Sequence, residues 1–462
     1  MYYFFKIIFI LLSLIIIPKD NYSINDKPNF IIYLSDDQDF LDYNIFGNEN
    51  VQSNGVNRLA SEGIRFTNFH TGQAICAPSR SQLYTGLYPL KNGSYTNHTN
   101  VRNNTLTIVQ HLKKLGYKVV LAGKDHIGPR KVFDFDLHIK KIENKKLDLN
   151  KIDKYLQTIK GPFCLILASD YPHGPHPNES EYKVSDIKKH PYDFNINPKK
   201  TGYYEFIKND DNQLSKVLDI IDNNGLTNNS IFIYAADHGY SGKFSLYQKG
   251  LKIPFILRWP NKIKPNLKNN SLLTIVDVLP TLVDIAGGST EDFDGKSFLP
   301  ILENKKNDVN EHIYGVSTRQ NIQSTFVFPS RMISDGKFKL IRNYNSIEVF
   351  NKNLTSNKII NHFIELGAKQ FKRIPYEELY NLESDPYEKK NLASNTKFND
   401  IKNSLSDKLK EWMEDQNDFV GIGKMPLLKP TLHPLDQNSK WKTVNDLYIG
   451  KLELDDYMKT HY

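Results

Sequence analysis

An uninterrupted apolar run turns directly into polar residues in the stretch Phe30-Ile31-Ile32-Tyr33-Leu34-Ser35-Asp36-Asp37. A continuous run of this kind predicts a strand that is buried on both faces, as in a parallel sheet covered by helices. Two adjacent carboxylates at the end of a buried strand repel each other unless protons or a cation neutralise them. We therefore expect a hard metal ion beside Asp36 and Asp37. The ordinary alternative is that these aspartates form a turn or a helix cap.

Three further apolar runs end in the same way. They are residues 119–122 before Gly123-Lys124-Asp125-His126, residues 163–168 before Ser169-Asp170-Tyr171-Pro172-His173, and residues 231–235 before Asp237-His238-Gly239. Helical patterns lie between the runs, at residues 56–61, 106–115 and 203–223. This alternation predicts an α/β domain in which helices sandwich a large, mixed but mostly parallel sheet. Ligands bind beyond the carboxyl ends of such strands, so the four polar clusters are predicted to form one active site.

Each cluster by itself also fits an ordinary structural role. Asp237-His238-Gly239 fits a turn, and Lys124 and His126 fit surface positions. His173 lies in a proline-rich loop that fits a stiff connection. The functional interpretation depends on the convergence of carboxylates, imidazoles and a lysine at four successive strand ends.

The motif Cys76-Ala77-Pro78-Ser79-Arg80 lies outside these strand ends. Proline is favoured at the first position of a helix, so Pro78 predicts a helix that begins there and continues through Leu83. Cys76 would then lie at a helix N-terminus, where free N–H groups and the helix dipole attract an anion. The ordinary alternatives for Cys76 are a buried thiol or half of a disulfide. The other cysteine, Cys164, lies in the apolar run at residues 163–168 and is expected to be a small buried hydrophobe.

Several segments resemble the type I sulfatases, which belong to the alkaline phosphatase superfamily. These are the Cys76 motif continued to Gly86, residues 57–68, residues 115–128 and residues 378–393. The resemblance implies an alkaline-phosphatase-like catalytic domain and a smaller C-terminal α+β domain that carries an antiparallel sheet. It also implies that a maturation enzyme converts Cys76 to formylglycine (3-oxoalanine). One hydroxyl of the hydrated aldehyde would attack sulfur, and the second would expel sulfate and restore the aldehyde.

The same resemblance implies a metal site and a set of catalytic residues. A divalent cation, usually calcium, would be held by Asp36, Asp37, Asp237, His238 and the modified Cys76. An imidazole is less typical of calcium than an oxygen ligand, so His238 leaves the identity of the metal open.

The catalytic set that the resemblance implies surrounds the nucleophile. Arg80 would hold the formylglycine and its metal environment. Lys124 and His126 would face the nucleophile. His173 would bind the sulfate or protonate the leaving group, and Lys243 would bind a sulfate oxygen. Fixed cationic groups of this kind stabilise the charge that shifts during sulfuryl transfer.

The loops around the predicted site resemble those of heparan N-sulfatases (sulfamidases) more than those of arylsulfatases. The segments concerned are residues 35–37, 171–174, 241–243 and 330–342. This resemblance implies a sulfated glycan as the substrate. Two alternatives stay open: a phosphate or phosphonate ester hydrolase of the same superfamily, and a secreted glycan-binding protein that has lost catalysis.

The length of 462 residues predicts two domains, a catalytic domain at residues 24–328 and a C-terminal domain at residues 329–462. Lys6 precedes an uncharged run at residues 7–17, which predicts a signal peptide over residues 1–23 and export of the protein. The run is shorter than the ~20 residues of a spanning helix, so no stable membrane span is expected. The net charge of +8 is spread along the chain without an arginine-rich block, which argues against a nucleic-acid partner. A homodimer stays open.

Overall fold

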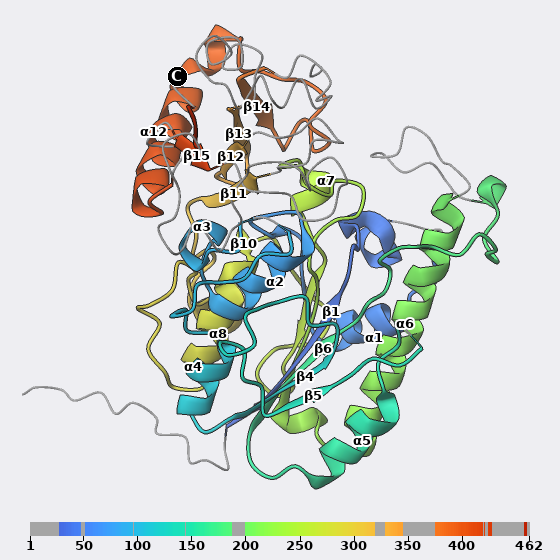
Figure 1. Ribbon diagram of the computed structural model, residues 1–462. Coiled ribbons are helices and arrows are strands. Elements are labelled where there is room, and N and C mark those ends of the chain that lie inside the picture. Colours follow the sequence, from blue (N-terminus) through green and yellow to red (C-terminus); the bar gives the residue numbers. More distant parts are fainter. Residues whose placement is uncertain are drawn as a thin grey trace, which may run out of the picture.

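A central sheet of eight strands organises the larger part of the protein, shown in Figure 1. The computed structural model describes residues 27–47, 51–95, 97–143, 145–186, 199–318, 329–344, 375–418, 420, 424–426 and 457–459, so the predicted signal peptide at residues 1–23 lies outside it. The strand order is β5-β4-β6-β1-β7-β8-β2-β9. In chain order the strands are β1 (Asn29–Ser35), β2 (Ile64–Phe66), β4 (Lys118–Gly123), β5 (Leu137–Ile139), β6 (Phe163–Ala168), β7 (Ser230–Ala236), β8 (Phe255–Arg258) and β9 (Leu267–Asn269).

The four strands predicted from the sequence are neighbours in the middle of this sheet. β4, β6, β1 and β7 pair in parallel, with Ile32 of β1 opposite Ile166 of β6 and Ile233 of β7. β8 runs antiparallel to both β7 and β2, which makes the sheet mixed. The prediction of a mixed, mostly parallel sheet is confirmed.

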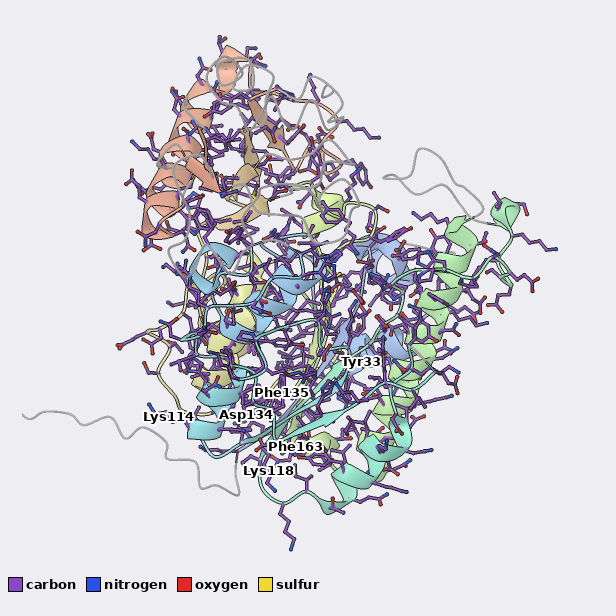
Figure 2. The ribbon with its side chains drawn as sticks, viewed as in Figure 1. Tyr33, Lys114, Lys118, Asp134, Phe135 and Phe163 are labelled. Carbon is purple, nitrogen blue, oxygen red and sulfur yellow. The ribbon has the colours of Figure 1, made fainter. Side chains whose placement is uncertain are left out.

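Helices cover both faces of the sheet because the side chains of each strand alternate between two hydrophobic clusters. In β1, Phe30, Ile32 and Leu34 join one cluster, while Ile31 and Tyr33 join the other. The first cluster lies under α2 (Cys76–Thr85), α4 (Ile108–Lys114) and α8 (Val278–Ile285), and the second lies under α1 (Asn54–Glu62), α5 (Leu149–Thr158) and α6 (Lys199–Asn223). Figure 2 shows side chains filling the space between sheet and helices.

Helix boundaries differ by a few residues from the predicted ones. α4 begins at Ile108 rather than at residue 106, because Thr107 and Gln110 form a capping box that sets its first turn. α2 begins at Cys76, so Pro78 is the third helical residue and the prediction that the helix starts at Pro78 is wrong. The first four N–H groups of a helix have no partner within it, so proline is tolerated throughout this turn. The prediction that Cys76 lies at a helix N-terminus is confirmed.

A second sheet, β11-β12-β13-β14, is antiparallel throughout and packs with α12 (Asn399–Asp415). Its strands are β11 (Ile313–Thr318), β12 (Pro329–Ser334), β13 (Phe338–Asn343) and β14 (Glu377–Asn381). Trp412 of α12 packs against Tyr314 of β11 and Tyr88, with ring centroids 4.6 and 5.2 Å apart. The predicted boundary after residue 328 falls behind β11, and we propose a boundary ahead of Ile313, since this keeps the sheet in one domain.

Short elements complete the structure. They are α3 (Pro89–Asn92), α7 (Gln248–Leu251), α9 (Leu299–Leu302), the pair β3 (Phe69–His70) and β10 (Leu273–Thr274), and the pair β15 (Lys424–Pro426) and β16 (Tyr457–Lys459). Within the described residues, no helix combines the length and the apolar character needed to cross a bilayer.

Candidate active site

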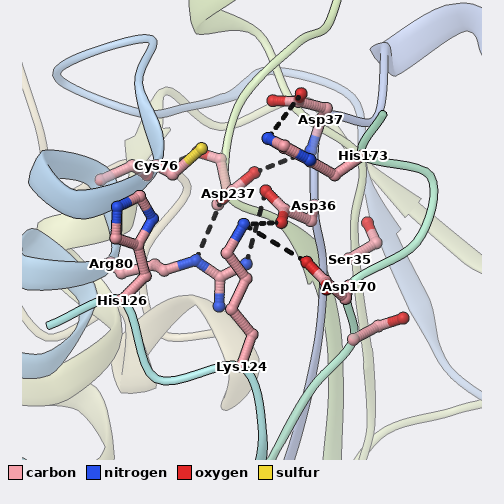
Figure 3. Close-up of polar contacts among 12 residues, drawn as sticks. Ser35, Asp36, Asp37, Cys76, Arg80, Lys124, His126, Asp170, His173 and Asp237 are labelled. Carbon is pink, nitrogen blue, oxygen red and sulfur yellow. Dashed lines mark hydrogen bonds and ion pairs between the residues drawn. The ribbon is translucent and has the colours of Figure 1, made fainter. Parts of the chain in front are cut away.

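The predicted site residues meet where the central parallel strands end. Backbone hydrogen bonds continue the sheet just beyond the strands: the N–H groups of Asp36, Lys124 and Asp237 donate to the carbonyls of Tyr171, Ala168 and Ser35, at 2.8, 2.8 and 3.0 Å. These bonds hold the three polar residues in register beside one another. Figure 3 shows their side chains converging from separate strand ends.

Gly123 controls how the chain leaves β4. Its φ of +96° lies in the left-handed region, and a Cβ there would lie 2.2 Å from the carbonyl oxygen of Ala168. Only glycine adopts this conformation without strain at so close an approach. The turn directs Lys124 across the strand ends, where its ammonium forms an ion pair with Asp36 and lies 3.5 Å from Oδ1 of Asp170.

A buried, oxygen-rich centre lies between the ends of β1 and β7. One ligand atom from each of Asp36, Cys76, Asp237 and His238 lies within 4.8 Å of the other three, and all four residues are buried. Oδ1 of Asp36 accepts no hydrogen bond from the described residues. Burial raises the pKa of Asp237, and the neighbouring Asp36 raises it further. Such a set of crowded carboxylates fits a bound divalent cation, which would relieve the repulsion between them.

Asp37 lies beside this centre and contacts Lys243 and His238. Lys243 donates to both carboxylate oxygens of Asp37 at 2.9 Å, and Nε2 of His238 lies 3.1 Å from Oδ1. The backbone N–H of Asp37 donates to Oδ1 of Asp237 at 3.0 Å, which joins the two strand ends directly. Although burial opposes the charged form of Lys243, Cys76 and Asp37 raise the pKa of its ammonium.

Cys76 is at the N-terminus of α2, close to the carboxylates. Its Sγ lies 3.3 Å from Nε2 of His238 and 3.6 Å from Nζ of Lys243. Burial, followed by the charges of Asp36 and Asp237, raises the pKa of the thiol to about 11. Cys76 and Cys164 are both free, and Cys164 is buried in β6, so the alternative of a disulfide between them is excluded.

Arg80 lies one turn along α2 and is completely buried. Its Nε donates to Oδ2 of Asp237 at 3.1 Å, and its Nη2 lies 3.6 Å from Oδ1 of Asp36. Although burial opposes the charged form, these two carboxylates raise the pKa of the guanidinium. Arg80 therefore balances part of the negative charge of the centre and holds the two aspartates in place.

The two predicted imidazoles have opposite electrostatic surroundings. Burial, and then Lys124, lower the pKa of His126 to about 3, so this ring is neutral. A hydrogen bond to Cys76 raises the pKa of His173 against the effect of burial, and Asp36 raises it further. His173 is therefore the better proton donor of the two.

Two residues at the site were not among the predicted site residues. Nδ1 of His98 lies 2.9 Å from Nε2 of His126, and Asp170 lies between Lys124 and Lys141, pairing with both. Asp170 follows β6 directly and belongs to a predicted polar cluster, so its position did carry a signal. His98 lies in a loop that follows no strand, and the sequence pattern around it gives no comparable signal.

A cavity of about 950 Å³ opens onto these groups. Its lining includes Cys76, Lys124, His126, His173 and Lys243. Each predicted catalytic residue except the buried Arg80 thus faces one common space, and the predicted metal ligands other than Cys76 lie at the ends of the strands that support it. The volume suits a substrate larger than a single sulfate group.

The fold is alkaline-phosphatase-like, and its ionisable groups gather at one edge of a mostly parallel sheet. A family model described as Sulfatase matches residues 28–289, and one described as N-sulphoglucosamine sulphohydrolase, C-terminal, matches residues 236–356. Because the first covers more than half of the chain, the protein belongs to the sulfatase family, enzymes that hydrolyse sulfate esters. The alternative of a binding protein without catalysis loses its support.

Three relatives illustrate this membership. An ulvan-active sulfatase of Formosa agariphila is 46% identical over 94% of this chain and 91% of that protein. The human N-sulphoglucosamine sulphohydrolase is 24% identical over 84% of this chain and 90% of that protein. A solved structure of a 2-O GAG sulfatase (BT1596) superposes with a TM-score of 0.68 at 21% identity, covering 90% of this chain and 97% of that one, and it supports the fold.

Proposed function

We propose that this sulfatase removes sulfate from a sulfated glycan, using a formylglycine made from Cys76 and a divalent cation, usually calcium. One observation carries the proposal: Cys76 begins a helix within 4.8 Å of the ligand atoms of Asp36, Asp237 and His238, at a cavity that Lys124 and Lys243 also line. The relatives that act on ulvan and on N-sulphoglucosamine support a glycan substrate, and the second of them keeps the heparan N-sulfatase type open.

The protein's own side chains would bind the sulfate and manage its charge. Lys124 and Lys243 place ammonium groups on either side of the carboxylate centre, and both have a raised pKa. Fixed positive charges in a cavity stabilise the charge that develops on sulfate oxygens without the cost of reorganising water. His173 would donate a proton to the departing glycan oxygen, while the neutral His126, held by His98, would orient groups by hydrogen bonding.

Asp36, Asp37, Asp237 and His238, together with residue 76, would hold the cation. When bound, the cation would polarise a sulfate oxygen and offset the negative charge of the carboxylates.

Calcium should stabilise the folded protein whether or not substrate is present. At a calcium concentration a hundred times the Kd, the free energy of unfolding should rise by about 2.7 kcal/mol. Calorimetry in EDTA and after addition of calcium measures the change. Asp36→Asn should lose the increase, whereas Asp134→Asn, at an exposed aspartate, should keep it. Equal melting temperatures in EDTA and in excess calcium would contradict the proposed metal site.

Mass spectrometry of the tryptic peptide from Phe66 to Arg80 tests the modification directly. Protein made in a host that has the maturation enzyme should show the loss of mass expected when a thiol becomes an aldehyde. Trapping with a hydrazide should label the same peptide, since only the aldehyde reacts. Intact cysteine in active protein would overturn the proposal.

Release of sulfate from ulvan and from heparin identifies the glycan class, and matched phosphate esters test the alternative hydrolase reaction. We expect sulfate esters to be turned over with the higher kcat/KM. A clear preference for phosphate or phosphonate esters would contradict the assignment of the substrate.

We further propose that residues 1–23 direct export of the protein to the compartment where such glycans are found. A maturation enzyme would act on Cys76, and association into a homodimer can be measured by light scattering.

A further inference from the structure

One wall of the active-site cavity carries a group of lysines that the proposed sulfate-binding set does not include. The backbone groups of Ile142 and Lys146 bond to each other in both directions, at 2.8 and 2.9 Å, and close a tight turn. Lys141, Lys145 and Lys146 of this turn line the same cavity as Cys76. The turn therefore adds positive charge to the substrate cavity from a segment that follows no predicted strand end.

Lys145 differs from Lys141 and Lys146 in the groups that contact its ammonium. Lys141 is paired with Asp170, and Lys146 is paired with Glu143. Among the described residues, no carboxylate lies within ion-pair distance of Lys145. Its ammonium instead donates to the carbonyl oxygens of His173, Gly174 and Asp170, at 2.7, 3.4 and 3.5 Å, and lies 5.2 Å from the ring centroid of Phe206.

An ammonium without an ion-pair partner at the wall of a cavity favours an anion from the ligand. Lys145 is half-buried, and burial lowers the pKa of its ammonium even though the charges of Asp170 and Asp36 act in the opposite direction. The ring of Phe206, which also lines the cavity, offers an apolar surface beside the charge. A charge next to an apolar ring suits an acidic sugar, which presents a C–H face and an anionic group together.

We propose that Lys145, flanked by Lys141 and Lys146, forms an accessory anion subsite. It takes a second anionic group of the glycan, a uronate carboxylate or a second sulfate, while Lys124 and Lys243 hold the sulfate that is removed. This inference rests on the proposed function. Two anchoring points in one cavity would fix the orientation of the glycan and select polyanionic chains over substrates with a single charge.

The test compares substrates with one and with two anionic groups. The first is a methyl glycoside with one O-sulfate, and the others are disaccharides that add either a uronate or a second sulfate. The ratio to be measured is kcat/KM for a substrate with two anionic groups divided by kcat/KM for the substrate with one. Lys145→Gln should lower this ratio about tenfold, chiefly by raising KM for the substrates with two anionic groups. Lys145→Arg should restore most of this ratio. Lys151→Gln, at an exposed lysine outside the cavity lining, is the matched control.

Two outcomes would overturn the subsite. An unchanged ratio would show that Lys145 does not recognise a second charge. An equal fall in kcat for all three substrates would show that Lys145 only positions the His173 loop. The disaccharide that loses more affinity in Lys145→Gln identifies the natural anion as carboxylate or sulfate.

Binding separates this inference from the proposed function. Calorimetric titration of the methyl glycoside and of the two disaccharides into Cys76→Ala protein measures affinity without turnover. Lys145→Gln in this background should lower the affinity for two-charge ligands about tenfold relative to the one-charge ligand. If the unsubstituted protein releases no sulfate but the affinity difference is observed, the proposed function is rejected and the subsite is retained. If the unsubstituted protein releases sulfate but the affinity difference is missing, the subsite is rejected and the proposed function is retained.

Discussion

Cys76→Ala should abolish sulfate release, with a fall in kcat of at least ~10⁴-fold, because alanine offers no atom that can be converted into a nucleophile. The fold should survive, since Cys76 lies at the first turn of α2 and alanine is a good helix former. Sulfate release from a glycan, measured with equal amounts of folded protein, gives the effect on kcat. Thermal unfolding verifies that the variant is folded.

Cys164→Ser is the matched control for this loss. Cys164 is buried in β6 among apolar side chains, and a serine hydroxyl there costs about 1–3 kcal/mol when it finds no partner. We expect a lower melting temperature with kcat retained at temperatures where the protein is folded. Similar losses of kcat in folded samples of both variants would contradict a unique role for Cys76.

His173→Gln should produce the second largest loss, and the size of the loss should depend on the leaving group. A general acid contributes about 10²–10⁴-fold to rate when the leaving group needs a proton. A sugar alcohol needs one, whereas 4-nitrophenolate leaves readily without it. We therefore expect a fall in kcat of about 10²–10⁴-fold for a sugar sulfate and a much smaller fall for 4-nitrophenyl sulfate.

The pH dependence provides an independent measurement of the same role. As the proton donor, His173 must be protonated for turnover, and before Cys76 is converted a hydrogen bond to the thiol and the charge of Asp36 raise the pKa of its imidazole. Activity on a sugar sulfate should accordingly fall as the pH rises through this pKa. The alkaline limb should be absent in His173→Gln.

His126→Gln is the matched imidazole control for His173. Because the His126 ring is neutral, its replacement should lower kcat for the sugar sulfate and the aryl sulfate by similar factors. Equal losses for the two substrates in His173→Gln as well would contradict a role for His173 in protonating the leaving group.

The sequence predicted the central sheet well because the signal is local. Each of β1, β4, β6 and β7 is buried on both faces over most of its length, and this requires a continuous apolar run that can be recognised without tertiary information. The carboxyl ends of parallel strands meet at one edge, so the residues that follow them were predicted to converge. Asp36, Lys124, His173 and Asp237 do so.

The boundaries of elements depended on individual side-chain contacts. The start of α4 is set by the reciprocal bonds of Thr107 and Gln110, and the start of α2 lies two residues ahead of Pro78. β11 joins its sheet through six pairs with β12, although residues 319–328 separate the two strands in the sequence. Pairing across such a distance leaves no periodic mark at the domain boundary.

The sequence by itself determined that carboxylates, imidazoles and a lysine gather where the buried strands end, at one edge of the sheet. Only the tertiary structure decided which loops close over that edge. His98 reaches His126 from 28 positions away, and Lys145 reaches the carbonyl of His173 across a separation of 28 residues. Apolar periodicity records which residues are buried within an element, whereas contacts between loops depend on how the packed helices and strands place the loop ends in space.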